Sequence, residues 1–150
     1  MLPEVQLYVV RLREIRSDIL KTLDGLNADS LNWHPLPKET NSLFALATHL
    51  LGAERRWLHH EVGQRKIERD RAAEFRARGE DLAPLRAAYD TVARESDEIL
   101  ARLVESEMAA RREVPDAYTV RECILHVIEH YSEHLGQMRL TRQLWENQQS

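Results

Sequence analysis

Three histidines fall four residues apart between Cys123 and Thr141, at His126, His130 and His134. On an α-helix, residues four apart project from the same side, about one turn from each other. A step of about 100° per residue also gathers the apolar residues of this segment into one stripe, with His130 and His134 on its border. That stripe consists of Val120, Ile124, Val127, Tyr131, Met138 and Trp145. The segment therefore predicts a helix that packs on other helices and carries a ladder of imidazoles beside its buried face.

Three further segments show the same helical spacing of apolar residues. They run from about Glu4 to Leu23, from a cap at Thr40, Asn41 or Ser42 to about Val62, and from about Asp81 to Ala110. Thr119 and Glu122 form a capping box that opens the last helix. The sequence Val114-Pro115-Asp116 breaks the helix before it, because proline lacks the backbone donor that a helix needs.

These segments, without any strand-like alternation, predict an all-α fold: a single four-helix bundle over residues 1–150. The connections Leu26–Asn41 and Gln64–Glu80 are long enough for crossovers, so a simple up-down-up-down order is not required. The second connection is rich in Arg, Glu and Asp and is predicted to be a solvated, partly helical crossover.

Charge and cysteine content exclude several classes of function. The net charge of −4 gives no basic field that would attract nucleic acid. No stretch approaches the roughly 18 apolar residues of a membrane span, and no secretory signal follows Met1. Cys123 is the only cysteine, which rules out an intrachain disulfide and fits a reducing compartment. A cytoplasmic protein is expected.

The second helix carries two polar residues on its apolar side. His49 lies at the edge of the stripe, with small residues Gly52 and Ala53 near it, which leaves room for a polar group or ligand. Glu54 lies near the middle of the stripe, which suits either a salt bridge at a helix seam or an acid/base group. His59 and His60, at the end of this helix, are predicted to be surface residues, as is His34 in the first connection.

Histidine is the commonest metal ligand, and three imidazoles with an open position suit Zn²⁺, Ni²⁺ or Fe²⁺. Two ligands on one helical turn define one edge of such a site, and the third must come from another helix, which brings in His49. Chance His-x₃-His pairs are common, so the histidines also fit a packed core without metal. The Glu-x-x-His motif of di-iron bundles is absent, which excludes that site.

The segment Asn41–Trp57, with His49 and Glu54, and the segment His126–Gln137, ending His-x₃-His-x-Gly-Gln, resemble the DinB-like (damage-inducible) metalloprotein superfamily. The resemblance extends over nearly the whole chain. It implies a four-helix bundle with a divalent metal ion, zinc or nickel, held by one histidine of the second helix and two of the fourth. By position these are His49, His130 and His134, with His126 as a neighbour.

Members of this superfamily with an assigned activity are mostly thiol S-transferases or a thiol-dependent isomerase. The resemblance therefore implies a small-molecule substrate and attack by a metal-activated low-molecular-weight thiol, or by water, on a small electrophile. Glu54 and Gln137 are the candidate catalytic residues, with Glu129 and Glu133 as further groups that would support the ligands. Cys123 is expected to be a buried small hydrophobe rather than a nucleophile.

Two alternatives stay open at the level of sequence. One is a non-catalytic bundle that binds metal or a small ligand in a stress response. The other is a structural homodimer in which the histidines are core groups. Many relatives form dimers, although no apolar stripe of this chain requires one. An open coordination position beside a polar pocket would favour the enzyme.

Overall fold

The computed structural model describes residues 1–114 and 117–149, and within this part all regular elements are helices. The four long helical segments are α1 (Pro3–Leu23), α3 (Leu43–Glu54) with its π-helical continuation η1 (Arg55–Val62), α5 (Ala83–Ala101) and α7 (Val120–Gln148). The short helices are α2 (Ala28–Asn32), α4 (Arg71–Arg76) and α6 (Glu105–Met108). The predicted all-α bundle is confirmed. Pro115 and Asp116 of the predicted helix break lie outside the described residues.

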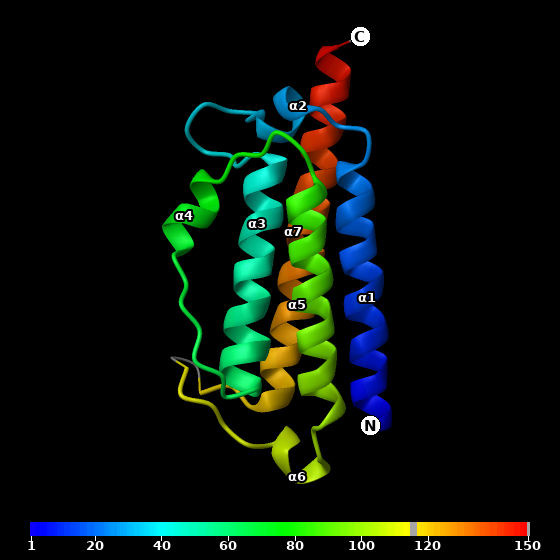
Figure 1. Cartoon of the computed structure of the whole chain (residues 1–150), viewed down its shortest axis with the longest axis vertical. Helices are drawn as coiled ribbons and strands as arrows, with labels where there is room; N and C mark the ends of the chain where they lie inside the picture. The colour runs from blue at the N-terminus through cyan, green and yellow to red at the C-terminus, as the bar shows by residue number, and fades with distance from the viewer. Residues whose placement is uncertain (115–116, 150) are drawn as a thin grey trace.

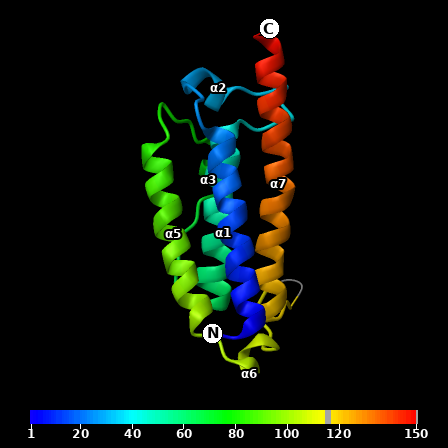
Figure 2. The same ribbon diagram turned by 90° about the vertical axis from the view of Figure 1, so that its right-hand side faces the viewer.

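The long helices form a bundle with one crossover. Helices α1 and α3 each pack against both α5 and α7. In Figures 1 and 2, α1 and α7 run upward, whereas α3 and α5 run downward. The chain therefore returns along the whole bundle between residues 63 and 82, and α4 lies in this return segment against α3. The long second connection is thus a crossover that places a short helix beside the second long one.

Side-chain caps set the helix starts that the sequence predicts. The hydroxyl of Ser42 accepts a hydrogen bond from the backbone N–H of Ala45 at 3.2 Å, which opens α3. Thr119 and Glu122 form the predicted capping box: each side chain accepts a hydrogen bond from the other residue's backbone N–H, at 3.3 and 2.7 Å. The position of α7, and with it the histidine ladder, is therefore fixed from its first turn.

The end of the second helix differs from the prediction. From Arg55 to Val62 it is π-helical, and a π-helix has more residues per turn than the α-helical spacing assumed from sequence. As a result His59 turns inward and is only 2% exposed, so its prediction as a surface residue is wrong. Its Nε2 lies 3.0 Å from the hydroxyl of Ser96. His60 remains half-buried, and its Nδ1 lies 2.8 Å from the carbonyl of Arg65.

The third helix is shorter than predicted. It ends at Ala101, and a separate turn, α6, follows at Glu105–Met108. The apolar spacing explains the break: after Leu103 the next buried side chain is Met108, and Ser106 and Glu107 stand where a continued stripe would need apolar residues. The Glu107 carboxylate instead accepts a hydrogen bond from the backbone N–H of Val104, which starts the new turn.

Helix α7 buries the face that the sequence predicts, including Tyr131 and Cys123. Burial raises the pKa of the Cys123 thiol to about 11, which fits its prediction as a small core residue. Trp33 folds back from the first connection and contacts Trp145 of α7 with ring centroids 5.7 Å apart. Among the described residues, no helix is long and apolar enough to cross a membrane.

Candidate metal centre

The structure brings His49, His130 and His134 together. Helix α3 supplies His49 from its buried side, and α7 supplies His130 and His134 from one turn. The two helices pack directly against each other. The hydroxyl of Tyr131 lies 3.1 Å from the carbonyl oxygen of Leu50, which joins the helices next to the histidines. The cross-helix pairing inferred from spacing is therefore present.

All three imidazole rings direct their Nε2 atom toward a common point between the two helices. His130 Nε2 lies 3.3 Å from Nε2 of His49 and 2.9 Å from Nε2 of His134. Two nitrogens that bind one zinc ion tetrahedrally lie about 3.3 Å apart, given Zn–N bonds of about 2.0 Å. One ligand atom from each residue falls within 4.8 Å of the others, a grouping that could hold a metal ion. The spacing thus fits three ligands of one divalent ion.

Hydrogen bonds on the outer nitrogens orient two of the rings. His49 Nδ1 lies 3.0 Å from Oε2 of Glu74, and His134 Nδ1 lies 2.7 Å from Oε1 of Gln137. The Nη2 of Arg69 also lies 3.5 Å from His49 Nδ1, but it donates to Glu74 at the shorter distance of 2.8 Å. Because Glu74 and the Gln137 oxygen are acceptors, each Nδ1 carries the proton and donates it, and each Nε2 keeps its lone pair toward the centre. This is the tautomer that a metal ligand needs.

His130 completes the donor set. Its Nδ1 is buried and has no hydrogen-bond partner among the described residues. Burial, followed by the neighbouring imidazoles of His134 and His49, lowers the pKa of His130 to about 3. A neutral His130 has one N–H group. That group can donate a hydrogen bond to Nε2 of His49 or to Nε2 of His134, but not to both. A cation at the centre would satisfy all three, so the residues present fit a bound divalent ion.

Glu74 is the supporting residue that the sequence did not reveal. It lies in α4, is buried, and accepts hydrogen bonds from Nε and Nη2 of Arg69 at 2.7 and 2.8 Å as well as from His49. Burial raises the pKa of Glu74, but the bonds from Arg69 and His49 outweigh it and leave the pKa below its usual range. The carboxylate is therefore ionised beside His49. In the sequence, only the small residue Gly52 indicated that a polar side chain could lie beside His49.

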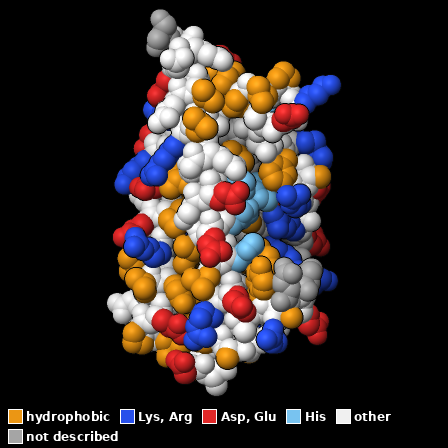
Figure 3. Space-filling view, turned by 180° about the vertical axis from the view of Figure 1, so that it is seen from behind, with side chains coloured by type: hydrophobic (Ala, Val, Ile, Leu, Met, Phe, Trp, Pro, Cys, Tyr) orange, Lys and Arg blue, Asp and Glu red, His pale blue; other side chains and the backbone are white. Residues whose placement is uncertain are grey.

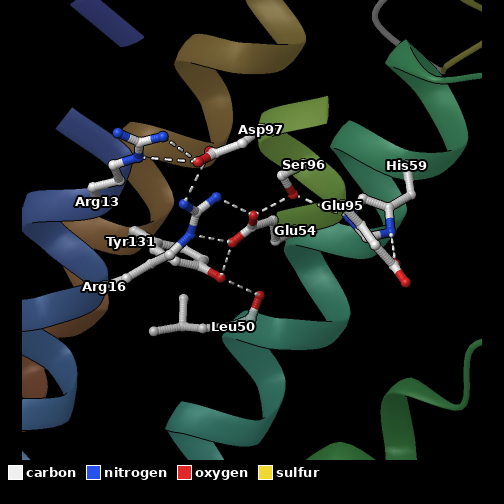
Figure 4. Close-up of polar contacts among 9 residues, drawn as sticks. All are labelled: Arg13, Arg16, Leu50, Glu54, His59, Glu95, Ser96, Asp97 and Tyr131. Atoms are coloured by element: carbon white, nitrogen blue, oxygen red, sulfur yellow. Dashed lines mark hydrogen bonds and ion pairs between the residues drawn. The ribbon is translucent and has the colours of Figure 1, made fainter. Parts of the chain in front are cut away.

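Glu54, predicted as a catalytic candidate, lies in a different network (Figure 4). Its carboxylate is fully buried and pairs with the guanidinium of Arg16 from α1. It also accepts hydrogen bonds from the hydroxyls of Ser96 and Tyr131, at 2.5 and 2.6 Å. The alternative of a salt bridge at a helix seam is therefore the one that the structure shows, and it joins all four long helical segments.

The other predicted site residues lie at different distances from the triad. Gln137 bonds to His134 and lines the adjoining cavity. Glu129 and Glu133 are exposed on α7 and make no hydrogen bond to the triad within the described chain. The His126 ring contacts the Trp57 ring at a tilt, with centroids 4.3 Å apart, and lies 5.8 Å from the His130 ring, so it neighbours the triad without joining it.

The triad opens into a cavity of about 840 Å³. On this face of the molecule, histidine side chains are visible within a hollow, with hydrophobic side chains above and basic side chains beside them (Figure 3). The apolar lining residues include Trp33, Leu36, Leu140 and Leu144, and the charged ones are Glu39 and Arg71. A cavity of this size admits a drug-sized molecule next to the histidines.

Fold and site together define a class: an all-helical bundle with a three-histidine group shared between its second and fourth long helices. Residues 9–147 match the family model of the mycothiol S-transferases, and the chain belongs to this DinB-like family. Comparison with curated proteins gave no match. Among solved structures, a conserved protein from Enterococcus faecalis superposes with a TM-score of 0.77 at 13% identity, over 96% of this chain and 98% of that one. At this identity the similarity shows the fold alone.

Proposed function

We propose that the chain is a divalent-metal-dependent thiol S-transferase that joins a low-molecular-weight thiol to a small electrophile. The observation that carries the proposal is the convergence of three Nε2 atoms at the wall of the 840 Å³ cavity. Three protein ligands facing a cavity leave a coordination position for a substrate, which is the arrangement of catalytic rather than structural sites. Membership of the mycothiol S-transferase family supports the thiol as the nucleophile.

Neutral imidazole donors suit zinc or nickel, and such an ion, when bound, would lower the pKa of a thiol or water beside it. In the reaction, the thiol releases its proton to water, its sulfur forms a bond to the electrophilic carbon, and the leaving group departs with the electrons of the broken bond. The chain's residues prepare this step. Glu74 and Gln137 hold two of the imidazoles in the required tautomer.

Gln137 has a second role in the proposal. Its amide oxygen accepts the hydrogen bond from His134, so its NH₂ group is free to donate to a molecule in the cavity that it lines. Glu54 contributes differently: it anchors Tyr131, the residue next to His130, and so fixes α7 against α3. We therefore propose a substrate-contacting role for Gln137 and a positioning role for Glu54.

The test is thiol consumption with a chromogenic electrophile such as 1-chloro-2,4-dinitrobenzene and 2-mercaptoethanol as the thiol. Zinc- or nickel-loaded protein should accelerate the reaction, and the His130→Ala/His134→Ala variant should not. The protein's own thiol does not interfere with this assay. Cys123 is buried and its pKa is raised, so it will not consume the electrophile. Metal binding without acceleration for a panel of thiols would favour the alternative, a non-catalytic metal-binding bundle.

A further inference from the structure

The cavity runs along one face of α7, starting at the histidine triad. Among the described residues of α7, none before His130 lines it. Its lining residues include a series with alternating steps of four and three, which keeps side chains on one helix face: His130, His134, Gln137, Thr141, Leu144 and Gln148. At about 1.5 Å per residue, Leu144 lies about 15 Å along the helix axis from His134. The cavity is therefore elongated, with the triad at one end.

The end of the cavity away from the triad is apolar. Leu140 and Leu144 line it from α7, and Leu36 lines it from the first connection. These three side chains are 56%, 42% and 51% exposed, and hydrophobic side chains are visible above the histidines in Figure 3. Single exposed leucines are common on protein surfaces, but several that gather in one hollow mark a binding groove. An apolar molecule bound there would remove their surface from water.

We infer that this apolar end binds the alkyl chain of an elongated, uncharged electrophile, whose reactive carbon lies beside the histidines. The inference rests on the proposed function and names the class of electrophile that the site accepts. A terminal epoxide with an alkyl chain is such a molecule. The thiol releases its proton to water, and its sulfur bonds to the terminal carbon of the epoxide. The C–O bond at that carbon breaks, and the oxygen takes up a proton from water.

Local contacts hold the apolar wall in place. The hydroxyl of Thr40 accepts a hydrogen bond from the backbone N–H of Leu36 and donates one to its carbonyl, both at 2.9 Å. This pair closes the turn that carries Leu36. Trp33, which also lines the cavity, contacts Trp145 and so fastens the first connection to α7. The wall is therefore formed before a ligand binds, which lowers the entropic cost of binding.

The charges of the cavity favour an uncharged occupant. Apart from the histidines, Glu39 and Arg71 are the charged side chains among its described lining residues, and neither lies on α7. Gln137 and Thr141, which lie on the stripe between the triad and Leu144, are polar but neutral. The leucines come from two separate segments and line one hollow. Sites for small molecules are concave in this way, whereas a second copy of the bundle would present convex helix surfaces.

The experiment uses epoxides that differ only in chain length: 1,2-epoxybutane, 1,2-epoxyhexane and 1,2-epoxyoctane. The measured quantity is kcat/KM of the metal-loaded protein with 2-mercaptoethanol as the thiol. We expect it to rise by about two- to fourfold for each added methylene, the range for partial to full burial of that group. The unreactive alcohols 1-butanol, 1-hexanol and 1-octanol, measured by calorimetry, should show the same rise in affinity without any transfer.

The two leucines of α7 can be changed without disturbing the core, because both are about half exposed. Leu140→Ser/Leu144→Ser should reduce the rise to less than about 1.5-fold per methylene, while kcat/KM for 1,2-epoxybutane changes less than about twofold. The matched control is Leu125→Ser, which changes a 36% exposed leucine of the same helix outside the cavity lining. It should keep the wild-type dependence on chain length.

Equal values along both series for the wild type would overturn the inference, as would a rise that the double variant leaves unchanged. A wild-type dimer that the double variant dissociates, with no effect of chain length, would place a second copy on these leucines instead, and sedimentation detects it. The alcohols separate this inference from the proposed function. If no epoxide reacts but alcohol binding rises with chain length through Leu140 and Leu144, the transferase proposal fails and the apolar site stands.

Discussion

Gly52 leaves the space that the Glu74 carboxylate occupies: a Cβ at Gly52 would overlap Oε1 of Glu74. Because Gly52 of α3 has no side chain, the Glu74 carboxylate of α4 can approach His49 closely enough to form a hydrogen bond. The carboxylate is held from the far side by Arg69. The sequence predicted His49 as a member of the site, but the residue that orients its ring comes from the crossover.

Gly52→Ala should therefore weaken metal binding without unfolding the bundle. The added methyl displaces Glu74 from His49, and loss of such a support typically lowers metal affinity about 10- to 100-fold. Competition with a chelator of known affinity measures the change. Gly136→Ala on α7 is the matched control, because nothing lies within 4 Å of its added Cβ. It should leave the affinity unchanged and stabilise the helix by about 0.5–1 kcal/mol.

Glu74→Ala should reproduce the loss, and the two changes should not add. If Gly52→Ala acts only by moving Glu74, it costs little further affinity once the carboxylate is gone. The double variant should thus bind metal about as weakly as Glu74→Ala alone. Additive losses would show that the methyl disturbs His49 by another route.

Glu54→Gln should destabilise the fold rather than alter the chemistry of the histidines. The change leaves the buried Arg16 guanidinium with only the more distant carboxylate of Asp97, 3.6 Å away, and breaking a buried ion pair costs about 3–5 kcal/mol. Urea unfolding of metal-free protein measures this cost. A variant as stable as the wild type, yet inactive when metal-loaded, would instead support the prediction of Glu54 as a catalytic group.

Acid should remove the same stabilisation. Burial raises the pKa of Glu54, but the ion pair with Arg16 and the hydrogen bonds from Ser96 and Tyr131 outweigh it, so the folded pKa lies below the ordinary 4.5. The contribution is fully present above that value and is lost as the pH falls through the folded pKa. The stability difference between wild type and Glu54→Gln should shrink below pH 4.5. A constant difference down to the acid transition would contradict this assignment.

Much of the architecture follows from local patterns. The spacing of Val120, Ile124 and Val127 and the capping box at Thr119 define α7, and with it the pair His130–His134. The π-helical segment could not be predicted, because the sequence of 55–62 fits an α-helical spacing as well. It is the reason that His59 points inward to Ser96.

The residues that support the site were harder to predict than its three histidines. Glu74 lies in a segment rich in acidic and basic residues, each of which is expected to be exposed to solvent. Only the path of the crossover in the folded chain brings Glu74, rather than another carboxylate, next to His49. Glu54 was ambiguous for another reason: a carboxylate on an apolar stripe shows that it must be paired, but its partner Arg16 is 38 residues away in sequence.

The most direct measurement is the metal content of untagged protein after incubation with zinc or nickel and removal of free ion. Wild type should retain about one divalent ion per chain, His126→Ala should retain the same amount, and His130→Ala/His134→Ala should retain none. A wild type that binds no metal would contradict the metal centre and leave the histidines as core groups of a structural bundle. Metal retained by the double variant would place the ion elsewhere.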